Sequence, residues 1–215
     1  MNEENPDTYL LGEVWEDGTT KIAYSQRRKY LLGRETNGLM NYPFRTALMA
    51  YLLGGGAEYF RDSMEELREN YPAPAFYGAM NFLSTMTRQG FDDLRPHLPR
   101  AADARRARGL SAQRFRPCAR MSLLKLAALI LYTFPGSPML YYGDEAGMQG
   151  FEDPFNRGTY PWGRENAELV QYFQQLGALR KAHERCKAAR SSTMPRRAAR
   201  WRSRAARSRD HCLTA

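Results

Sequence analysis

The sequence predicts an α/β fold in which short strands and longer helices alternate along the chain. Short runs rich in Leu, Met, Tyr and Phe are each followed by a longer run whose apolar residues recur every three or four positions. A strand-like run is followed by a helix-like run four times along the chain. This alternation is typical of βα units on a parallel sheet. With 215 residues, 43% of them hydrophobic, the chain is long enough to bury the core of one domain.

Four strands and four helical regions are expected, in alternating order. The strands are expected at residues 8–15, 38–43, 79–85 and 138–145. The helices are expected at residues 19–33, 44–71, 122–134 and 166–184. Three consecutive glycines divide the second helical region, and the proline-containing stretch 69–76 is expected to form a loop.

The expected strands end in polar side chains. These residues are Glu13, Asn41, Ser84, Thr85, Asp144 and Glu145. In a closed barrel of parallel strands, the carboxyl ends of the strands form the face on which active sites are built. Four βα units supply half of the eight that such a barrel contains.

Glu13, in the stretch LLGEVWED, has the surroundings of a general acid. The preceding glycine allows close approach, and the ring of Trp15 would desolvate the carboxyl group, which suits an acid whose pKa must be raised. The alternative interpretation is an ordinary surface glutamate at a strand end, with Trp15 packing against the core.

The stretch GSPMLYYGDEAGMQGFEDPFNRGTYPW predicts a strand followed by a long loop. Gly136 and Pro138 begin the strand, and GDE turns the chain into a loop that holds Asp153 and Arg157. One interpretation is a structural loop with a salt bridge between Asp153 and Arg157. The other is a loop that forms part of the wall of an active site.

Five blocks of the sequence resemble one family of enzymes. LLGEVWED, LMNYPF, MNFLST, GSPMLYYGDEAGMQG and EDPFNRGTYPW are similar to successive blocks of the α-amylase family, glycoside hydrolase family 13, and most of all to its neopullulanase, cyclomaltodextrinase and α-glucosidase-like members. The resemblance covers residues 5–85 and about 121–184. It implies a fragment of a (β/α)8 TIM-type barrel, about strands five to eight with their helices, and retaining hydrolysis of α-glucosidic bonds.

The resemblance also implies roles for individual residues. Glu13 would be the general acid/base of a glycosidase that hydrolyses O-glycosyl bonds. Residues implied to contact an α-glucan or maltooligosaccharide substrate are Trp15, Asn41, Tyr42, Asn81, Asp153 and Arg157. No cofactor or metal ligand is expected, and the calcium of some relatives has no support in this sequence. In the family the nucleophile is an Asp on the fourth strand, and no such block precedes Met1, so we expect this chain to be inactive.

The block after the third expected strand departs from the family. The family reads approximately NxLxTHDTPR, with a His and an Asp that bind the sugar, whereas this sequence reads NFLSTMTRQG. Met86 is encoded by ATG and Thr87 by ACN, so reading one base earlier gives xAT and then GAC, which encode His, where x is C, and Asp. The next three triplets permit Thr, Pro and Arg. One missing base therefore converts THDTPR into TMTRQG.

The positive charge of the chain comes from two segments. The formal net charge is +9, but residues 86–120, with nine Arg and three Asp, carry +6, and residues 186–215, with eight Arg, one Lys and one Asp, carry +8. The remainder is therefore mildly acidic. Out-of-frame reading of GC-rich DNA produces many CGN codons, which explains the excess of Arg over Lys. The cysteines, Cys118, Cys186 and Cys212, lie in the same segments without CxxC spacing.

These observations divide the chain into four parts. Residues 1–85 are expected to form part of a (β/α) barrel, and residues 121–185 to continue it. Residues 86–120 are expected to be an out-of-frame, disordered insert, and residues 186–215 an out-of-frame, disordered tail. The alternative is a genuine basic insertion and a genuine basic tail.

Two other functions fit parts of the sequence. A non-catalytic carbohydrate-binding remnant would stack glucose rings on aromatic side chains, namely Trp15, Tyr42, Tyr141, Tyr142, Tyr160 and Trp162. A nucleic-acid or anionic-surface binder would use the Arg-rich segments. Because phosphate binding does not require Arg rather than Lys, and residues 86–120 show no helical period, we expect no nucleic-acid partner.

The sequence shows no sign of secretion or membrane insertion. MNEENPDTYLL lacks a basic region followed by an apolar one. The longest apolar run, residues 123–134, contains Lys125 and is shorter than the roughly 20 residues of a membrane span. We expect a cytoplasmic chain without a membrane partner, and the sequence leaves the oligomeric state open.

Overall fold

The computed structural model describes residues 5, 8–32, 35–86, 117–148, 150, 153–154 and 156–183, with the side chains of residues 117–120 excluded. The chain divides into two compact units. The first unit comprises Met1–Phe82, Ile130–Met139 and Gly177–Ser192. The second comprises Leu83–Leu129, Leu140–Leu176 and Thr193–Ala215. Each unit is described by itself.

Four parallel strands form the sheet of the first unit, in the order in which they occur along the chain. They are β1 (Leu11–Gly12), β4 (Gly38–Leu39), β5 (Met80–Phe82) and β6 (Ser137–Met139). β1 pairs with β4, β5 pairs with β6, and a parallel bridge between Met40 and Met80 joins the two pairs. The consecutive parallel strands confirm the predicted parallel sheet, although the described residues between β1 and β4 hold a hairpin where a helix was predicted. Within the described residues β1 and β6 do not pair, so these strands form no closed barrel.

A glycine with a positive φ immediately precedes β6. Gly136 has φ +107, and a Cβ atom there would lie 2.7 Å from the carbonyl oxygen of Ala79. Only glycine tolerates both the backbone conformation and the close approach. The guanidinium of Arg180 donates to the carbonyl oxygens of Tyr132, Phe134 and Gly136, which fixes this turn.

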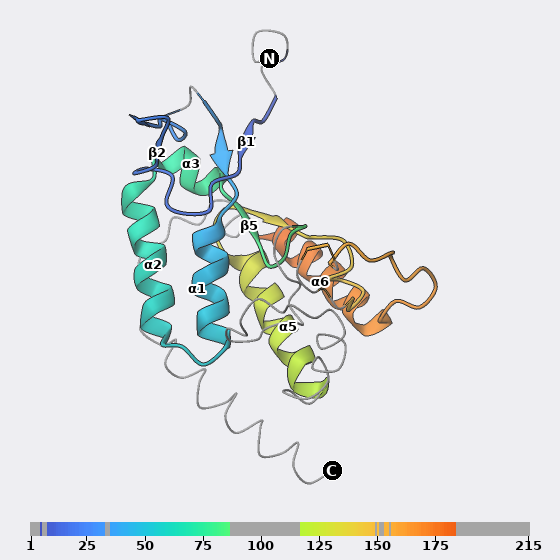
Figure 1. The fold of residues 1–215 in the computed structure, drawn as a ribbon. Helices are drawn as coiled ribbons and strands as arrows, with labels where there is room; N and C mark the ends of the chain where they lie inside the picture. The colour runs from blue at the N-terminus through green and yellow to red at the C-terminus, as the bar shows by residue number, and fades with distance from the viewer. Residues whose placement is uncertain are drawn as a thin grey trace. The chain divides into compact units, whose positions relative to one another are not determined.

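Three helices complete the first unit before β5. They are α1 (Tyr42–Leu52), α2 (Ala57–Asn70) and α3 (Ala73–Gly78), and α1 and α2 lie side by side in Figure 1. Asn41 caps α1 by accepting a 3.0 Å hydrogen bond from the Phe44 N–H. The core of this unit contains aromatic rings, with Phe134 5.0 Å from Phe44 and 6.0 Å from Phe60 between ring centroids.

The helix predicted at residues 19–33 is wrong. This segment holds the antiparallel hairpin β2 (Ile22–Ala23) and β3 (Gln26–Arg27), whose turn residues Tyr24 and Ser25 have φ of 52 and 61. Two of the apolar residues that suggested a helical face, Ile22 and Tyr24, lie at the surface, and Tyr24 is 93% exposed. The spacing of apolar residues alone therefore predicted a helix where the chain forms a hairpin, because no core covers these side chains.

Two further expectations need correction. The stretch 69–76, expected to be a loop, contains the end of α2 and the first residues of α3, where Pro74 occupies the first turn, the position at which proline costs a helix no hydrogen bond. The strand expected at 138–145 is shorter, because β6 ends at Met139 and the chain turns from Tyr142 to Gly147.

The second unit contains most of α5 (Pro117–Thr133) and the first part of α6 (Ala167–Ala182). α6 falls where the sequence predicted a helix, and α5 covers the helix predicted at 122–134 but begins earlier, at Pro117. The hydroxyl of Tyr172 donates a 3.0 Å hydrogen bond to the Lys125 carbonyl, and Lys125 also forms an ion pair with Glu168. The Asn166 side chain accepts a 3.1 Å hydrogen bond from the Leu169 N–H at the start of α6.

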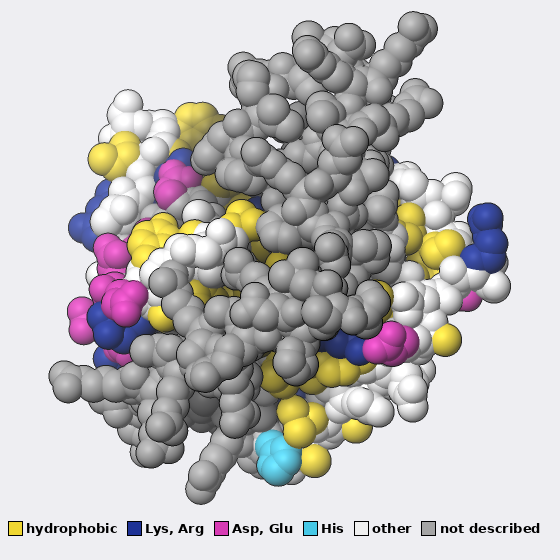
Figure 2. Space-filling model, turned by 90° about the horizontal axis from the view of Figure 1, so that it is seen from below, with side chains coloured by type: hydrophobic (Ala, Val, Ile, Leu, Met, Phe, Trp, Pro, Cys, Tyr) yellow, Lys and Arg dark blue, Asp and Glu magenta, His cyan; other side chains and the backbone are white. Residues whose placement is uncertain are grey.

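The two Arg-rich segments cannot be compared with expectation. Apart from Met86 and the backbone of residues 117–120, residues 86–120 and 186–215 lie outside the described residues. The described surface carries charges of both signs. On α2, Arg61 pairs with Asp62 and Arg68 with Glu65, and Figure 2 shows acidic and basic side chains beside one another at its left edge. None of the helices in the described ranges has the length and apolarity needed to span a bilayer.

Candidate active site

Glu13 follows β1, and its carboxylate accepts two hydrogen bonds. The Tyr42 hydroxyl donates to Glu13 Oε1 at 2.6 Å, and the Trp15 indole Nε1–H donates to the same oxygen at 3.2 Å. Glu13 itself is exposed. The arrangement therefore holds one carboxylate oxygen while leaving the group within reach of a ligand.

Trp15 and Tyr42 form a stacked aromatic pair beside this carboxylate. Their ring centroids are 5.6 Å apart with an interplanar angle of 26°, and Tyr42 meets Phe82 edge-on at 4.8 Å. Tyr42 is 2% exposed, whereas Trp15 is 52% exposed. Tyr42 thus anchors the pair in the core, and Trp15 presents an indole surface of the kind on which a sugar ring can stack.

Asn41, which follows β4, and Asn81, which lies within β5, form a buried amide network. Asn41 Nδ2 donates to Asn81 Oδ1 at 2.8 Å, and Asn81 Nδ2 donates to the Pro135 carbonyl at 2.7 Å. Both side chains are buried, and Asn41 also caps α1. The network links β4, β5 and the turn before β6. Direct contact of Asn41 or Asn81 with a substrate stays a prediction.

The loop after β1 is tied to the end of α2. The Gly18 N–H donates to the Tyr71 hydroxyl at 3.3 Å, and Asn70 Nδ2 donates to Asp17 Oδ2 at 2.7 Å. Burial is the main cause that raises the pKa of the Tyr71 hydroxyl to about 12. These contacts fix the chain immediately after Glu13 and Trp15.

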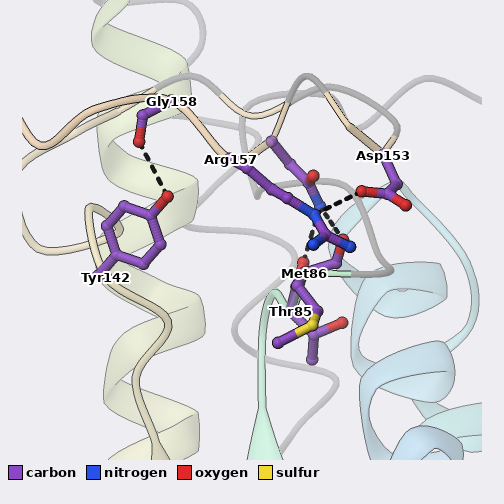
Figure 3. Close-up of polar contacts among 7 residues, drawn as sticks. Thr85, Met86, Tyr142, Asp153, Arg157 and Gly158 are labelled. Atoms are coloured by element: carbon purple, nitrogen blue, oxygen red, sulfur yellow. Dashed lines mark hydrogen bonds and ion pairs between the residues drawn. The ribbon is translucent and has the colours of Figure 1, made fainter.

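The second unit contains a separate group of buried polar residues. Ser84 Oγ donates to Asp144 Oδ2, and both residues are buried. Asn156 Nδ2 donates to the carbonyl oxygens of Thr85 at 2.9 Å and Met86 at 2.8 Å (Figure 3). The sequence placed Ser84, Thr85 and Asp144 at strand ends, but it gave no sign of the role of Asn156.

Asp153 and Arg157 lie in the same loop as Asn156. Arg157 Nε donates to Asp153 Oδ1 at 2.6 Å, which is the salt bridge that the sequence suggested, and both side chains remain exposed. The Tyr142 hydroxyl donates to the Gly158 carbonyl at 2.8 Å (Figure 3). The structure therefore brings Asp153 and Arg157 together on a loop that the hydrogen bond between Tyr142 and Gly158 holds in place.

The remaining aromatic residues of the sequence prediction also lie in the second unit. Tyr160 and Trp162 are 4.6 Å apart between ring centroids, and Trp162 is 81% exposed. Tyr141 and Tyr142 are 4.7 Å apart. Across the described ranges, no three His, Cys, Asp or Glu side chains gather in a way that could hold a metal ion.

Comparison with known proteins identifies the family of this chain. Residues 1–211 match the alpha amylase catalytic domain. The chain belongs to the alpha-amylase family. This is a family of α-glucan hydrolases, as the five sequence blocks implied, and the observed strands correspond to part of its catalytic domain.

Several members of the alpha-amylase family are similar over most of this chain. An amylopullulanase of Thermoanaerobacter thermohydrosulfuricus is 30% identical over 86% of the chain, which corresponds to 12% of that protein. A cyclomaltodextrinase of a Bacillus species is 28% identical over 85% of the chain and 28% of its own length. A solved cyclomaltodextrinase superimposes with a TM-score of 0.66 at 28% identity, covering 86% of this chain and 27% of that one. The chain therefore spans less than a third of these relatives.

Proposed function

We propose that the chain is the C-terminal half of the catalytic barrel of a retaining α-glucan hydrolase, with Glu13 as general acid/base. One observation carries the proposal. Glu13 stands after the first of four consecutive parallel strands, exposed, and its Oε1 accepts hydrogen bonds from Tyr42 and Trp15. The carboxyl ends of parallel barrel strands are where catalytic residues of this fold lie.

The geometry suggests how Glu13 would work. Because both donors converge on Oε1, Oε2 is the oxygen proposed to protonate the leaving glycosidic oxygen and later to take a proton from water. A retaining mechanism also needs a carboxylate nucleophile about 5 Å away, on the other side of the scissile bond. By family resemblance that nucleophile belongs to the strand before those matched here.

The substrate class that we propose is an α-glucan or maltooligosaccharide. Trp15 would stack on a glucose ring beside Glu13, with Tyr42 holding the indole in place. Asp153 and Arg157 would bind sugar hydroxyls, since both are exposed and charged. Asn41 and Asn81 are buried, so their contribution would be to fix the strand ends.

We propose that the 215-residue chain does not itself hydrolyse α-glucans. Met86 and Thr87 occupy the positions at which the family has the sugar-binding His and Asp. Neither side chain is charged, so neither can replace the carboxylate of that Asp. Loss of an essential member of a catalytic group generally costs several orders of magnitude in rate. An assay with maltotriose should show no turnover, and turnover that disappears in Glu13→Gln would contradict the proposal.

A carbohydrate-binding role without catalysis is a second candidate, and the exposed indole of Trp15 favours it. In the variant Trp162→Phe/Trp201→Phe, Trp15 is the single tryptophan, so its fluorescence reports on the Glu13 site. A saturable change on titration with maltotriose would support binding. A flat titration would exclude this role and leave an inactive fragment.

We also propose the four-part division of the chain, with residues 86 to about 120 and 186–215 translated out of frame. The codon relation between TMTRQG and THDTPR supports the first slip. The return of an apolar core in α5, which includes the buried Leu124, Ala127 and Leu131, supports a restored frame before these residues.

A further inference from the structure

We propose that Asn156 is a positioning residue that fixes the backbone turn at Thr85 and Met86. Its carboxamide nitrogen donates to the carbonyl oxygens of both residues, at 2.9 and 2.8 Å, across about seventy positions of sequence. Asn156 is 6% exposed, and Thr85 is buried. The chain turns at Met86, which is why two successive carbonyl groups can meet one nitrogen.

The chemistry of this contact favours asparagine over other residues. A primary amide nitrogen carries two N–H groups, so it satisfies two converging carbonyl groups at once. A hydroxyl offers a single donor, an ionised carboxylate offers none, and an apolar side chain would leave both carbonyl oxygens without this partner. Aspartate, although the same shape, would place negative charge against the two carbonyl dipoles.

The loop that carries Asn156 is held at a second point. The Tyr142 hydroxyl donates to the Gly158 carbonyl, two residues after Asn156, and Figure 3 shows Arg157 and Asp153 turned toward one another. Asn156 therefore joins the exposed Asp153–Arg157 pair to the turn at Met86. A shift of either segment would break the two hydrogen bonds of Asn156.

This positioning role would serve the reaction of the intact family fold, and in that respect it rests on the proposed function. Met86 occupies the position at which the family has its sugar-binding His, and its own side chain is 53% exposed. The two hydrogen bonds go to backbone carbonyl groups, so they hold this turn whatever side chain stands at residue 86. Asn156 would thus set the position of Met86 relative to Asp153 and Arg157.

Hydrogen exchange of the full-length chain tests this role directly. Asn156→Asp and Asn156→Leu should speed exchange of the peptide that contains residues 83–86 by about tenfold, because two hydrogen bonds that hold the turn are lost. Asn156→Gln, which keeps the NH₂ group, should recover part of the protection. Unchanged exchange at residues 83–86 in both donor-free variants would overturn the inference. If those two variants unfold, wild-type protection in a folded Asn156→Ala chain would overturn it equally.

A matched control separates positioning from general destabilisation. Tyr142→Phe removes the other brace of the loop but leaves both Asn156 hydrogen bonds, so exchange at residues 83–86 should stay within twofold of the wild type. Equal acceleration in Tyr142→Phe would overturn a specific role for Asn156. In parallel, the NMR signal of the Met86 methyl group is followed on addition of maltotriose. No response in the wild-type chain would exclude maltotriose binding by this chain, as a flat tryptophan titration would, while the exchange data would still decide the role of Asn156.

Discussion

The hydroxyl of Tyr42 donates a 2.6 Å hydrogen bond to the carboxylate of Glu13, although 29 positions separate the two residues in the sequence. Tyr42 is the first residue of α1 and is buried, whereas Glu13 follows β1 and is exposed. The hydrogen bond therefore limits the movement of the exposed Glu13 carboxylate, because the core holds Tyr42 in place. A catalytic acid must be held in this way, because its proton must reach a fixed point on the substrate.

The substitution Tyr42→Phe should cost about 1 kcal/mol of unfolding free energy, because it removes one hydrogen bond and keeps the ring contacts with Trp15 and Phe82. Tyr42→Ala should cost about 4 kcal/mol, because it also removes a buried ring. Urea denaturation measures both values. Equal losses in the two variants would mean that the ring contacts contribute nothing, contrary to the observed packing.

The amide network should respond as a coupled unit. Asn81→Leu should cost about 3 kcal/mol, because it leaves the Pro135 carbonyl and the Asn41 amide without this buried partner. Asn41→Ala should cost a similar amount, since it removes the same hydrogen bond and the cap of α1. The double variant should lose at least about 1 kcal/mol less than the sum of the single losses. Strict additivity in urea denaturation would contradict the network.

Much of the fold followed from periodicity in the sequence. Four changes from strand-like to helix-like spacing predicted a parallel sheet, and the parallel pairing of β1, β4, β5 and β6 confirms it. The hairpin around Tyr24 was missed because its turn contains Tyr and Ser rather than the Asn or Gly that marks a two-residue turn. Nothing local distinguishes its exposed apolar residues from a buried helical face.

The candidate site was predictable only where a residue type carries its own chemistry. Glu13 and Trp15 were identified as an acid and an aromatic ring after one strand, and the structure places them in contact. Asn41 was assigned to substrate, although Pro43 two residues later fits a helix start, and Asn41 caps that helix. Asn156 was missed because its partners lie about seventy positions away, and no pattern in the loop predicts such a contact.

Stability at high pH should depend on Tyr71. Burial raises its pKa from 10.0 to about 12 in the folded chain, so the unfolded state ionises first as the pH rises. The contribution of the neutral Tyr71 hydroxyl to the free energy of unfolding is complete below pH 10. It is lost between pH 10 and 12, and about 1.4 kcal/mol is lost at pH 11. The difference in unfolding free energy between Tyr71→Phe and the wild type should therefore shrink as the pH rises from 9 to 11. A constant difference between the two urea midpoints over this range would contradict the assignment.

The reading-frame hypothesis makes a prediction about the DNA. An independent sequence across the codons of Thr85 and Met86 should contain one base more, so that NFLST continues as HDTPR rather than MTRQG. The codons for residues 38–84 serve as the control, and they should be unchanged because their blocks match the family. If the present bases are confirmed instead, the Arg-rich segments belong to the protein. Their binding to nucleic acid should then be measured as a function of salt, since phosphate contacts by seventeen arginines would weaken steeply as salt rises.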